Sequence, residues 1–169
     1  MNIINITYPD INNGLGTRVT IWFAGCPFHC KECHNQTTWD YNQGTQFSIE
    51  KTLQDLDRLF RDRPYLAGIT LSGGDPLNGK TDYDLTQLQI FLQKFKDKFP
   101  TKNVWIYSGA YYETLLKNNK KKTILSYCDI LVDGPYEHNK RDIRLAFRGS
   151  SNQRIIDLHT GDILYLDKQ

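Results

Sequence analysis

The chain has 169 residues, a net charge of +2, a hydrophobic content of 39% and a charged content of 24%. This length fits one domain over residues 1–169, and the composition is that of a soluble globular protein. The small net charge argues against nucleic acid as a partner, and no apolar run is long enough to span a membrane. The N-terminal residues do not form a signal-peptide pattern, so we expect a cytoplasmic protein whose cysteines stay reduced.

Four strands and the helices between them can be predicted along the chain. The predicted strands are residues 18–23, 67–71, 103–107 and 129–133. The predicted helices are residues 49–61, which follow Ser48 as N-cap, residues 85–99, and shorter stretches at 113–117 and near 124–125. Residues 1–17 end in a turn-prone, glycine-bearing entry at residues 12–17, and the tail from Arg141 is predicted to close the sheet with one or two short strands. This alternation predicts an α/β fold with a parallel sheet and right-handed crossovers.

An unusual segment follows each predicted strand directly. These segments are the loop after residue 23, Ser72-Gly73-Gly74-Asp75, Ser108-Gly109 and Asp133-Gly134. The carboxyl ends of parallel strands share one edge of a sheet, and ligands bind at that edge in such folds. The sequence therefore predicts a functional site where these four segments meet.

The loop after the first strand carries Cys26, Cys30 and Cys33 at C-x3-C-x2-C spacing. Cysteine thiolates hold iron–sulfur clusters, and three of them would leave the fourth iron of a [4Fe–4S] cluster open for a substrate. His29 and His34 leave a second interpretation open, a compact Cys3His zinc site, and reduced core cysteines are a third. Convergence at the sheet edge favours the cluster, because a structural zinc site has no need of glycine turns beside it.

Simpler roles are expected for several other residues. Cys128 stands alone before a strand and is expected to be a buried, inert thiol. His29 is expected to be an exposed loop residue. Gly73 and Gly74 expose backbone groups to a ligand or form a plain turn, and Asp75 caps or orients the segment that follows.

Five motifs occur along the chain in a characteristic order. They are the cysteine loop, Ser72-Gly73-Gly74-Asp75-Pro76-Leu77, Trp105-Ile106-Tyr107-Ser108-Gly109, Asp129-Ile130-Leu131-Val132-Asp133-Gly134 and Arg148-Gly149-Ser150-Ser151-Asn152-Gln153-Arg154. Together they resemble the anaerobic ribonucleoside-triphosphate reductase activating proteins, a family of small radical S-adenosylmethionine (SAM) enzymes. The resemblance runs from Asn13 to about Asp157. It implies a partial TIM-type barrel of parallel strands with outer helices, the radical SAM core.

The resemblance also implies a mechanism. Cys26, Cys30 and Cys33 would hold the [4Fe–4S] cluster, and SAM would chelate the open iron through its amino and carboxylate groups. An electron from reduced flavodoxin or a similar donor would cleave SAM to methionine and a 5′-deoxyadenosyl radical. That radical would take a hydrogen atom from a glycine of the large reductase subunit and leave a glycyl radical there. No catalytic side chain is implied beyond the cluster and SAM.

Further residues are implied to contact SAM. They are Glu32, Cys33 and His34, whose backbone would line the adenine, Gly73 and Gly74, which would meet the amino group, and Ser108, which would approach the ribose. Asp133 is assigned either a cation or SAM contact or a turn and helix-capping role.

The chain departs from the wider superfamily at two positions. Glu32 stands where an aromatic residue is common, which leaves side-chain stacking on the adenine open, and Asp75 stands where glutamate is common. One alternative function is a radical SAM enzyme that acts on a different glycyl-radical enzyme or on a small molecule. A more remote alternative is a zinc-stabilised binding module.

Overall fold

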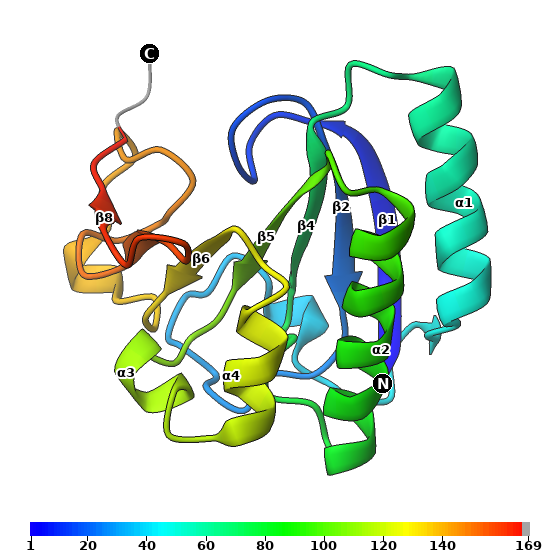
Figure 1. The fold of residues 1–169 in the computed structure, drawn as a ribbon. Helices are drawn as coiled ribbons and strands as arrows, with labels where there is room; N and C mark the ends of the chain where they lie inside the picture. Colours follow the sequence, from blue (N-terminus) through cyan, green and yellow to red (C-terminus); the bar gives the residue numbers. More distant parts are fainter. Residues whose placement is uncertain (167–169) are drawn as a thin grey trace.

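The computed structural model describes residues 1–166 and contains one open sheet with helices packed against it (Figure 1). The strands are β1 (Asn2–Asp10), β2 (Arg18–Phe23), β3 (Thr45–Gln46), β4 (Gly68–Gly73), β5 (Asn103–Tyr107), β6 (Ile130–Asp133), β7 (Arg154–Asp157) and β8 (Ile163–Leu164). The α-helices are α1 (Ile49–Asp62), α2 (Asp82–Lys98), α3 (Tyr112–Leu115) and α4 (Asn119–Leu125), and short 3-10 helices cover Gln36–Thr38 and His138–Lys140. None of the helices in the described residues has the length and apolar character needed to cross a bilayer.

The eight strands are ordered β3-β1-β2-β4-β5-β6-β7-β8. The central strands β2, β4, β5 and β6 are parallel, which confirms the predicted parallel sheet, whereas the strands on both sides of them pair antiparallel. The tail supplies β7 and β8, as predicted. The turn-prone entry predicted at residues 12–17 is confirmed, because these residues form bends, but β1 before it was not predicted. Its isoleucines do not alternate strictly with polar residues, and its pairing with β2 shifts register twice.

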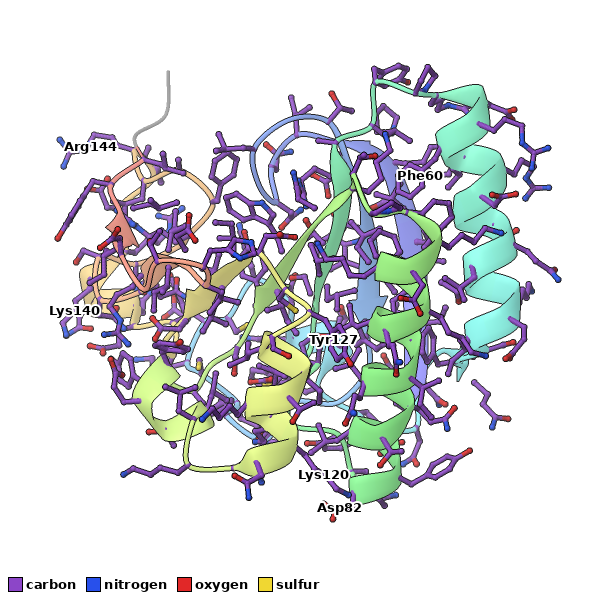
Figure 2. The ribbon with its side chains drawn as sticks, in the orientation of Figure 1. Phe60, Asp82, Lys120, Tyr127, Lys140 and Arg144 are labelled. Carbon is purple, nitrogen blue, oxygen red and sulfur yellow. The ribbon has the colours of Figure 1, made fainter. Side chains whose placement is uncertain are left out.

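Helices α1, α2 and α4 lie along one face of the sheet (Figure 1) and cover the main hydrophobic core. The predicted cap at Ser48 is confirmed, since its hydroxyl accepts a hydrogen bond from the N–H of Lys51 at 3.3 Å. Phe60 of α1 (Figure 2) packs against Phe95 of α2 and against Phe99, which caps α2. Its ring centroid lies 6.2 Å from that of Phe95 and 5.1 Å from that of Phe99. Burial of this apolar surface is the main force that holds the helices on the sheet.

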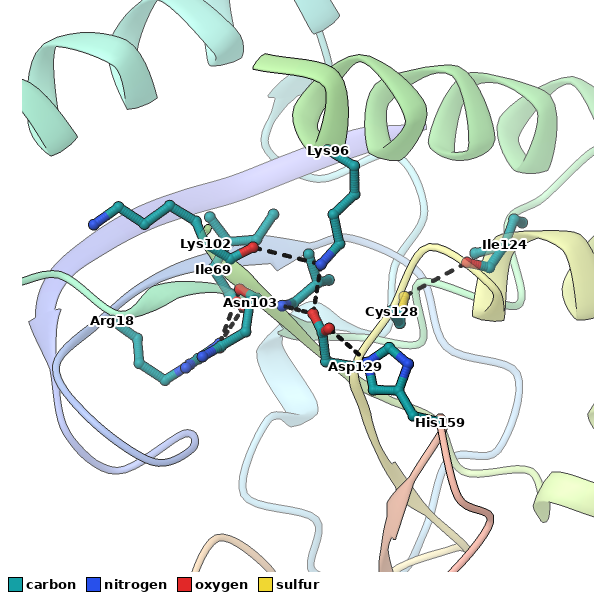
Figure 3. Close-up of polar contacts among 10 residues, drawn as sticks. Arg18, Ile69, Lys96, Lys102, Asn103, Ile124, Cys128, Asp129 and His159 are labelled. Atoms are coloured by element: carbon teal, nitrogen blue, oxygen red, sulfur yellow. Dashed lines mark hydrogen bonds and ion pairs between the residues drawn. The ribbon is translucent and has the colours of Figure 1, made fainter. Parts of the chain in front are cut away.

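The opposite face of the sheet has a smaller apolar cluster of Trp105, Val132 and Ile155. At the amino end of β2, the fully buried Arg18 side chain donates to the Ile69 carbonyl at 2.6 Å (Figure 3). It also donates to Thr70 Oγ1 at 2.7 Å. Burial lowers the pKa of Arg18 to about 10. These hydrogen bonds satisfy the guanidinium inside the protein and fix the amino ends of β2 and β4 together.

The segment that precedes β6 is held by Asp129 (Figure 3). Its carboxylate accepts hydrogen bonds from Lys96 Nζ at 2.7 Å and from the N–H of Val104 at 2.7 Å, and it lies 2.9 Å from His159 Nε2. Burial opposes ionisation of this carboxyl group, but these hydrogen bonds outweigh it and hold the pKa of Asp129 below its ordinary value. The adjacent Cys128 is 2% exposed, and burial raises its pKa, which confirms the predicted buried thiol.

Candidate functional site

The loop with the three cysteines begins at the carboxyl end of β2, and hydrogen bonds close its base. The N–H of Gly25 donates to the Thr38 carbonyl at 2.7 Å, and the N–H of Cys26 donates to the Trp39 carbonyl at 3.1 Å. Gly25 has a φ of +97°, and a Cβ at this position would lie 2.0 Å from the Tyr41 ring. Only glycine fits here, so this residue lets the chain turn sharply from β2 into the loop.

The three thiols of this loop, Cys26, Cys30 and Cys33, are partly exposed. Burial raises the pKa of Cys26 to about 11, although backbone N–H groups of Phe28 and His29 favour its thiolate. Burial also raises the pKa of Cys30, and Cys33 Sγ accepts a hydrogen bond from a backbone N–H at 3.4 Å. Reachable thiols with backbone donors beside them suit thiolate ligands of iron, and metal binding would displace their protons.

The donor arrangement in this loop differs from that of a mononuclear zinc site. Across residues 1–166, no three His, Cys, Asp or Glu side chains are gathered so as to hold one metal ion. His29 is exposed, as predicted, and stacks on Trp39 with 4.7 Å between ring centroids, while His34 is also exposed. Zinc needs its donors within about 2.0–2.3 Å of one point, whereas the cysteines of a cluster bind separate irons. A cluster therefore does not require the three thiols to converge on one point, whereas the Cys3His alternative does.

The end of β4 packs directly against the base of the cysteine loop. The N–H of Gly74 donates to the Phe23 carbonyl and that of Asp75 donates to the Gly25 carbonyl, both at 2.8 Å. A Cβ on Gly74 would lie 2.2 Å from the Gly25 oxygen, and Gly73 has a φ of +100°. The two glycines are therefore required by the close approach of two protein backbones.

Asp75 joins the loop after β4 to the loop after β5. Its side chain is buried and accepts hydrogen bonds from the N–H of Leu77 at 3.0 Å, the hydroxyl of Ser108 at 2.9 Å and the N–H of Gly109 at 2.9 Å. Burial raises the pKa of Asp75, although these hydrogen bonds oppose the change. The predicted orienting role of Asp75 is confirmed by these contacts, which hold two of the converging segments together.

Asp133 has a structural role at the end of β6. Its carboxylate is fully buried. It accepts hydrogen bonds from the N–H of Tyr112 at 2.7 Å and from Arg154 Nε at 3.0 Å. Arg154 also donates to both carboxylate oxygens of Glu113, at 3.0 and 2.9 Å. Of the two roles considered for Asp133, the structure supports the turn and helix-capping role, since its oxygens are occupied by donors of the protein itself.

A cavity of about 780 Å³ lies beside the cysteine loop, on the sheet face opposite the helices. The residues of its lining are Asn12, Asn13, Trp22, Glu32, Cys33, His34, Asn35, Ser72, Tyr107, Tyr136, His138, Arg141, Asp142, Ile143, Leu145, Phe147, Arg148, Gly149 and Gln153. This volume lies within the range of small-molecule sites, about 300–1,000 Å³. Cys33 is thus the cysteine that borders a space large enough for a cofactor.

The cavity contains some of the predicted contact residues and not others. Glu32, Cys33 and His34 belong to its lining, whereas Gly73, Gly74 and Ser108 do not. The side chain of Ser108 is buried and donates to Asp75. A contact of Ser108 with a ribose, and of the two glycines with an amino group, stays a prediction.

The strands supply three residues of the cavity lining: Trp22, Ser72 and Tyr107. Ser72 belongs to a segment that sequence analysis placed at the site, whereas Trp22 and Tyr107 were not proposed as site residues. Trp22 pairs with Ser72 in the register of β2 and β4, and Tyr107 follows the paired residues Leu71 and Ile106. Alternate strand residues point to opposite faces. This alternation is the signal that could have identified them, once the helices were assigned to the other face.

Glu32, the departure beside Cys33, has a partner across the cavity. Its Oε2 lies 3.1 Å from Nδ1 of His138, which belongs to the short helix after β6. The backbone of Glu32 has a φ of +57°, an uncommon conformation for a residue other than glycine. This contact joins the cysteine loop to the C-terminal part of the chain.

Comparison with known proteins identifies the family. Residues 12–156 match the family described as "4Fe-4S single cluster domain". The chain is 36% identical over 155 residues to an anaerobic ribonucleoside-triphosphate reductase-activating protein of Pasteurella multocida. The aligned region covers 92% of this chain and 96% of the relative. The chain belongs to the anaerobic ribonucleoside-triphosphate reductase-activating protein family. This confirms the resemblance found in the sequence.

Other members of the activating-protein family match over a similar extent. The Escherichia coli K12 protein of that name is 36% identical over 147 residues, covering 86% of this chain and 92% of the relative. The protein of that name from Enterobacteria phage T4 is 34% identical over 155 residues, covering 92% and 93%. The match to the cluster-domain family contains the whole cysteine loop and every strand residue that lines the cavity.

Proposed function

We propose that this protein activates an anaerobic ribonucleoside-triphosphate reductase by forming a glycyl radical on its large subunit. The observation that carries the proposal is the placement of the cysteine loop. The chain belongs to a family of activating proteins, and its cysteine loop lies at the carboxyl edge of the parallel strands. Through Cys33, the loop borders a cavity of about 780 Å³. Ligands bind at this edge in parallel α/β folds.

Cys26, Cys30 and Cys33 are proposed to hold the [4Fe–4S] cluster. The bound cluster and SAM would supply a one-electron cleavage of the sulfonium to methionine and a 5′-deoxyadenosyl radical that acts on the target glycine. The chain's own part is to hold the three thiolates apart, to keep one iron free of a protein ligand and to seat SAM beside it. The donor set fits this role, since the thiols are partly exposed and receive backbone hydrogen bonds.

SAM is proposed to occupy the cavity. Glu32, Cys33 and His34 would border its adenine, while Gly73, Gly74 and Ser108 are kept as proposed contacts at the adjoining sheet edge. Trp22 and Tyr107 contribute aromatic rings to the cavity lining. Apolar surface with a few polar groups is the usual lining of such a site, and it would keep water away from a reactive species.

The open sheet suits a macromolecular target. We propose that the chain forms a single radical SAM domain built as a partial barrel, whose incomplete side admits the glycine-bearing loop of the reductase. Electrons would come from flavodoxin or a similar donor, and the reaction would take place in the cytoplasm. The cavity is bordered by the segments after β2 and β6, so the target would approach between these two parts of the chain.

The test is anaerobic reconstitution with iron and sulfide, followed by reduction with dithionite in the presence of SAM. We expect bound iron and sulfide, 5′-deoxyadenosine as product, and an electron paramagnetic resonance signal that changes when SAM is added. Addition of the reductase large subunit should then produce the doublet signal of a glycyl radical.

The alternatives give different results in the same experiment. Deoxyadenosine without a glycyl radical on the reductase would indicate another glycyl-radical enzyme or a small molecule as the substrate. A colourless protein that binds zinc stoichiometrically and forms no deoxyadenosine would support the zinc-stabilised binding module and contradict the proposed function.

A further inference from the structure

One wall of the cavity is a closed loop between β6 and β7, residues 141–150. Arg141 and Ser150 form an antiparallel bridge at its base, and the N–H of Asp142 donates to the Gly149 carbonyl at 3.2 Å. Arg141 and Arg148 both line the cavity. Arg144 at the loop tip is directed outward, away from the sheet (Figure 2), and its Nη2 lies 2.9 Å from Asp142 Oδ2.

This loop is firmly anchored on both sides of Arg148. The hydroxyl of Tyr107 donates to the Phe147 carbonyl at 2.7 Å, and Phe147 has a φ of +57°. Beyond Arg148, the N–H of Gly149 donates to Gln153 Oε1 at 2.9 Å. A non-glycine residue in the left-handed region is unfavourable unless its surroundings enforce it, and such residues often occur at binding sites.

These anchors hold Arg148 beside the cavity, and one nitrogen of its guanidinium group has no hydrogen-bond acceptor among the described residues. Its Nε is buried and has no hydrogen-bond acceptor among the described residues. Two other arginines differ, since the buried Arg18 donates to a hydroxyl and to backbone carbonyls, and the half-buried Arg154 donates to two carboxylates. A buried donor without an acceptor costs stability, so its presence calls for an explanation.

The acidic groups of the cavity wall do not supply that acceptor. Glu32 contacts His138, and Asp142 receives hydrogen bonds from Arg144 Nε and Nη2 at 3.0 and 2.9 Å. The wall therefore offers positive charge from Arg141 and Arg148 while its carboxylates are engaged elsewhere. An arginine guanidinium matches the two oxygens of a carboxylate with two parallel hydrogen bonds.

We propose that Arg148, assisted by Arg141, binds the α-carboxylate of the amino-acid part of SAM. This inference rests on the proposed function, which gives the cavity a ligand with one carboxylate and no phosphate. A carboxylate has two oxygens with about four acceptor positions, so it can receive the guanidinium and still chelate an iron. Arg148 would thereby set the position of SAM relative to Cys33.

The experiment compares two ligands on the anaerobically reconstituted full chain. SAM and decarboxylated SAM differ only in the carboxylate, and their dissociation constants would be measured by equilibrium dialysis for the wild-type protein, Arg148→Gln, Arg148→Lys and Arg141→Gln. The control is Lys140→Gln, which removes a positive charge directly before the loop, and neither Lys140 nor its ion-pair partner Glu137 belongs to the cavity lining. Circular dichroism would verify that each variant is folded.

We expect Arg148→Gln to weaken SAM binding by about 10-fold to 100-fold, the effect of losing a hydrogen bond between charged groups. Decarboxylated SAM should bind the variant within about twofold of wild type, because both changes remove the same interaction. Arg148→Lys should give an intermediate loss for SAM, Arg141→Gln a smaller one, and Lys140→Gln none.

Two outcomes would overturn the inference while the proposed function stands. One is equal weakening of both ligands by Arg148→Gln, which would show that Arg148 shapes the loop rather than contacts the carboxylate. The other is unchanged SAM binding in Arg148→Gln. If the wild-type protein binds neither ligand, the proposed function fails, and the inference fails with it.

Discussion

The hydroxyl of Ser108 donates a hydrogen bond to the buried carboxylate of Asp75 at 2.9 Å, and this contact joins the loops that follow β5 and β4. The N–H of Asp75 in turn donates to the Gly25 carbonyl at 2.8 Å, at the base of the cysteine loop. One residue therefore connects three of the four segments that converge at the sheet edge. Its loss should affect both the stability of the fold and the geometry of the candidate site.

Replacement of Asp75 by Ala should lower the free energy of unfolding by about 3 kcal/mol, because it leaves buried donors of Leu77, Ser108 and Gly109 without an acceptor. Ser108→Ala should cost about 1 kcal/mol. In the double variant, the Ser108 change should cost almost nothing more, since its partner is already absent. Urea denaturation of the four proteins measures this coupling, and strictly additive losses would show that the contact has no energetic weight.

The four cysteines should separate into two classes. Replacement of Cys26, Cys30 or Cys33 by Ala is expected to reduce iron and sulfide content after anaerobic reconstitution and to abolish SAM cleavage. Cys128→Ala should keep the cluster and lose only about 1 kcal/mol of stability, since its buried thiol has a packing role. Full SAM cleavage by any of the three loop variants would falsify the assignment of the cluster ligands.

Gly73→Ala tests the close approach between β4 and the cysteine loop. Gly73 has a φ of +100°, and a Cβ there would lie 2.6 Å from the Phe23 oxygen, so we expect a loss of ~2–4 kcal/mol and poorer iron loading. Gly161 is a matched control, because it has a φ of +81° and no atom of residues 1–166 lies within 4 Å of an added Cβ. Gly161→Ala should cost only about 1 kcal/mol and leave iron loading unchanged. Equal losses would mean that the backbone conformation, and not the close approach, requires glycine at residue 73.

Asp129 should make the fold sensitive to acid. Its pKa is held below its ordinary value in the folded protein by Lys96, the N–H of Val104 and His159, so its stabilisation is present above the ordinary carboxyl pKa and is lost as the pH falls below it. Asp129→Asn should therefore be less stable than wild type at pH 7, and the difference should shrink below about pH 4. Denaturation midpoints measured from pH 7 to pH 3 would check this, and a difference that stays constant with pH would contradict it.

The sequence by itself determined the parallel centre of the fold and the edge where the candidate site lies. Its strands are buried on both faces and alternate with amphipathic helices, and such local patterns depend on few long-range contacts. The spacing of Cys26, Cys30 and Cys33 likewise indicated an iron–sulfur site, because three cysteines on one short loop can reach the separate irons of one cluster. The motif order was enough to identify the family.

Only the tertiary structure decided how the two faces and the ends of the chain are used. β1 escaped prediction because its pairing with β2 is irregular, and the role of Asp133 became clear only when Arg154 and Tyr112 were seen around it. Arg148 and Tyr107 lie 41 residues apart in the sequence, yet both line the same cavity. Burial and the lack of a partner at Arg148 Nε depend on contacts between distant segments, and no local pattern records such contacts.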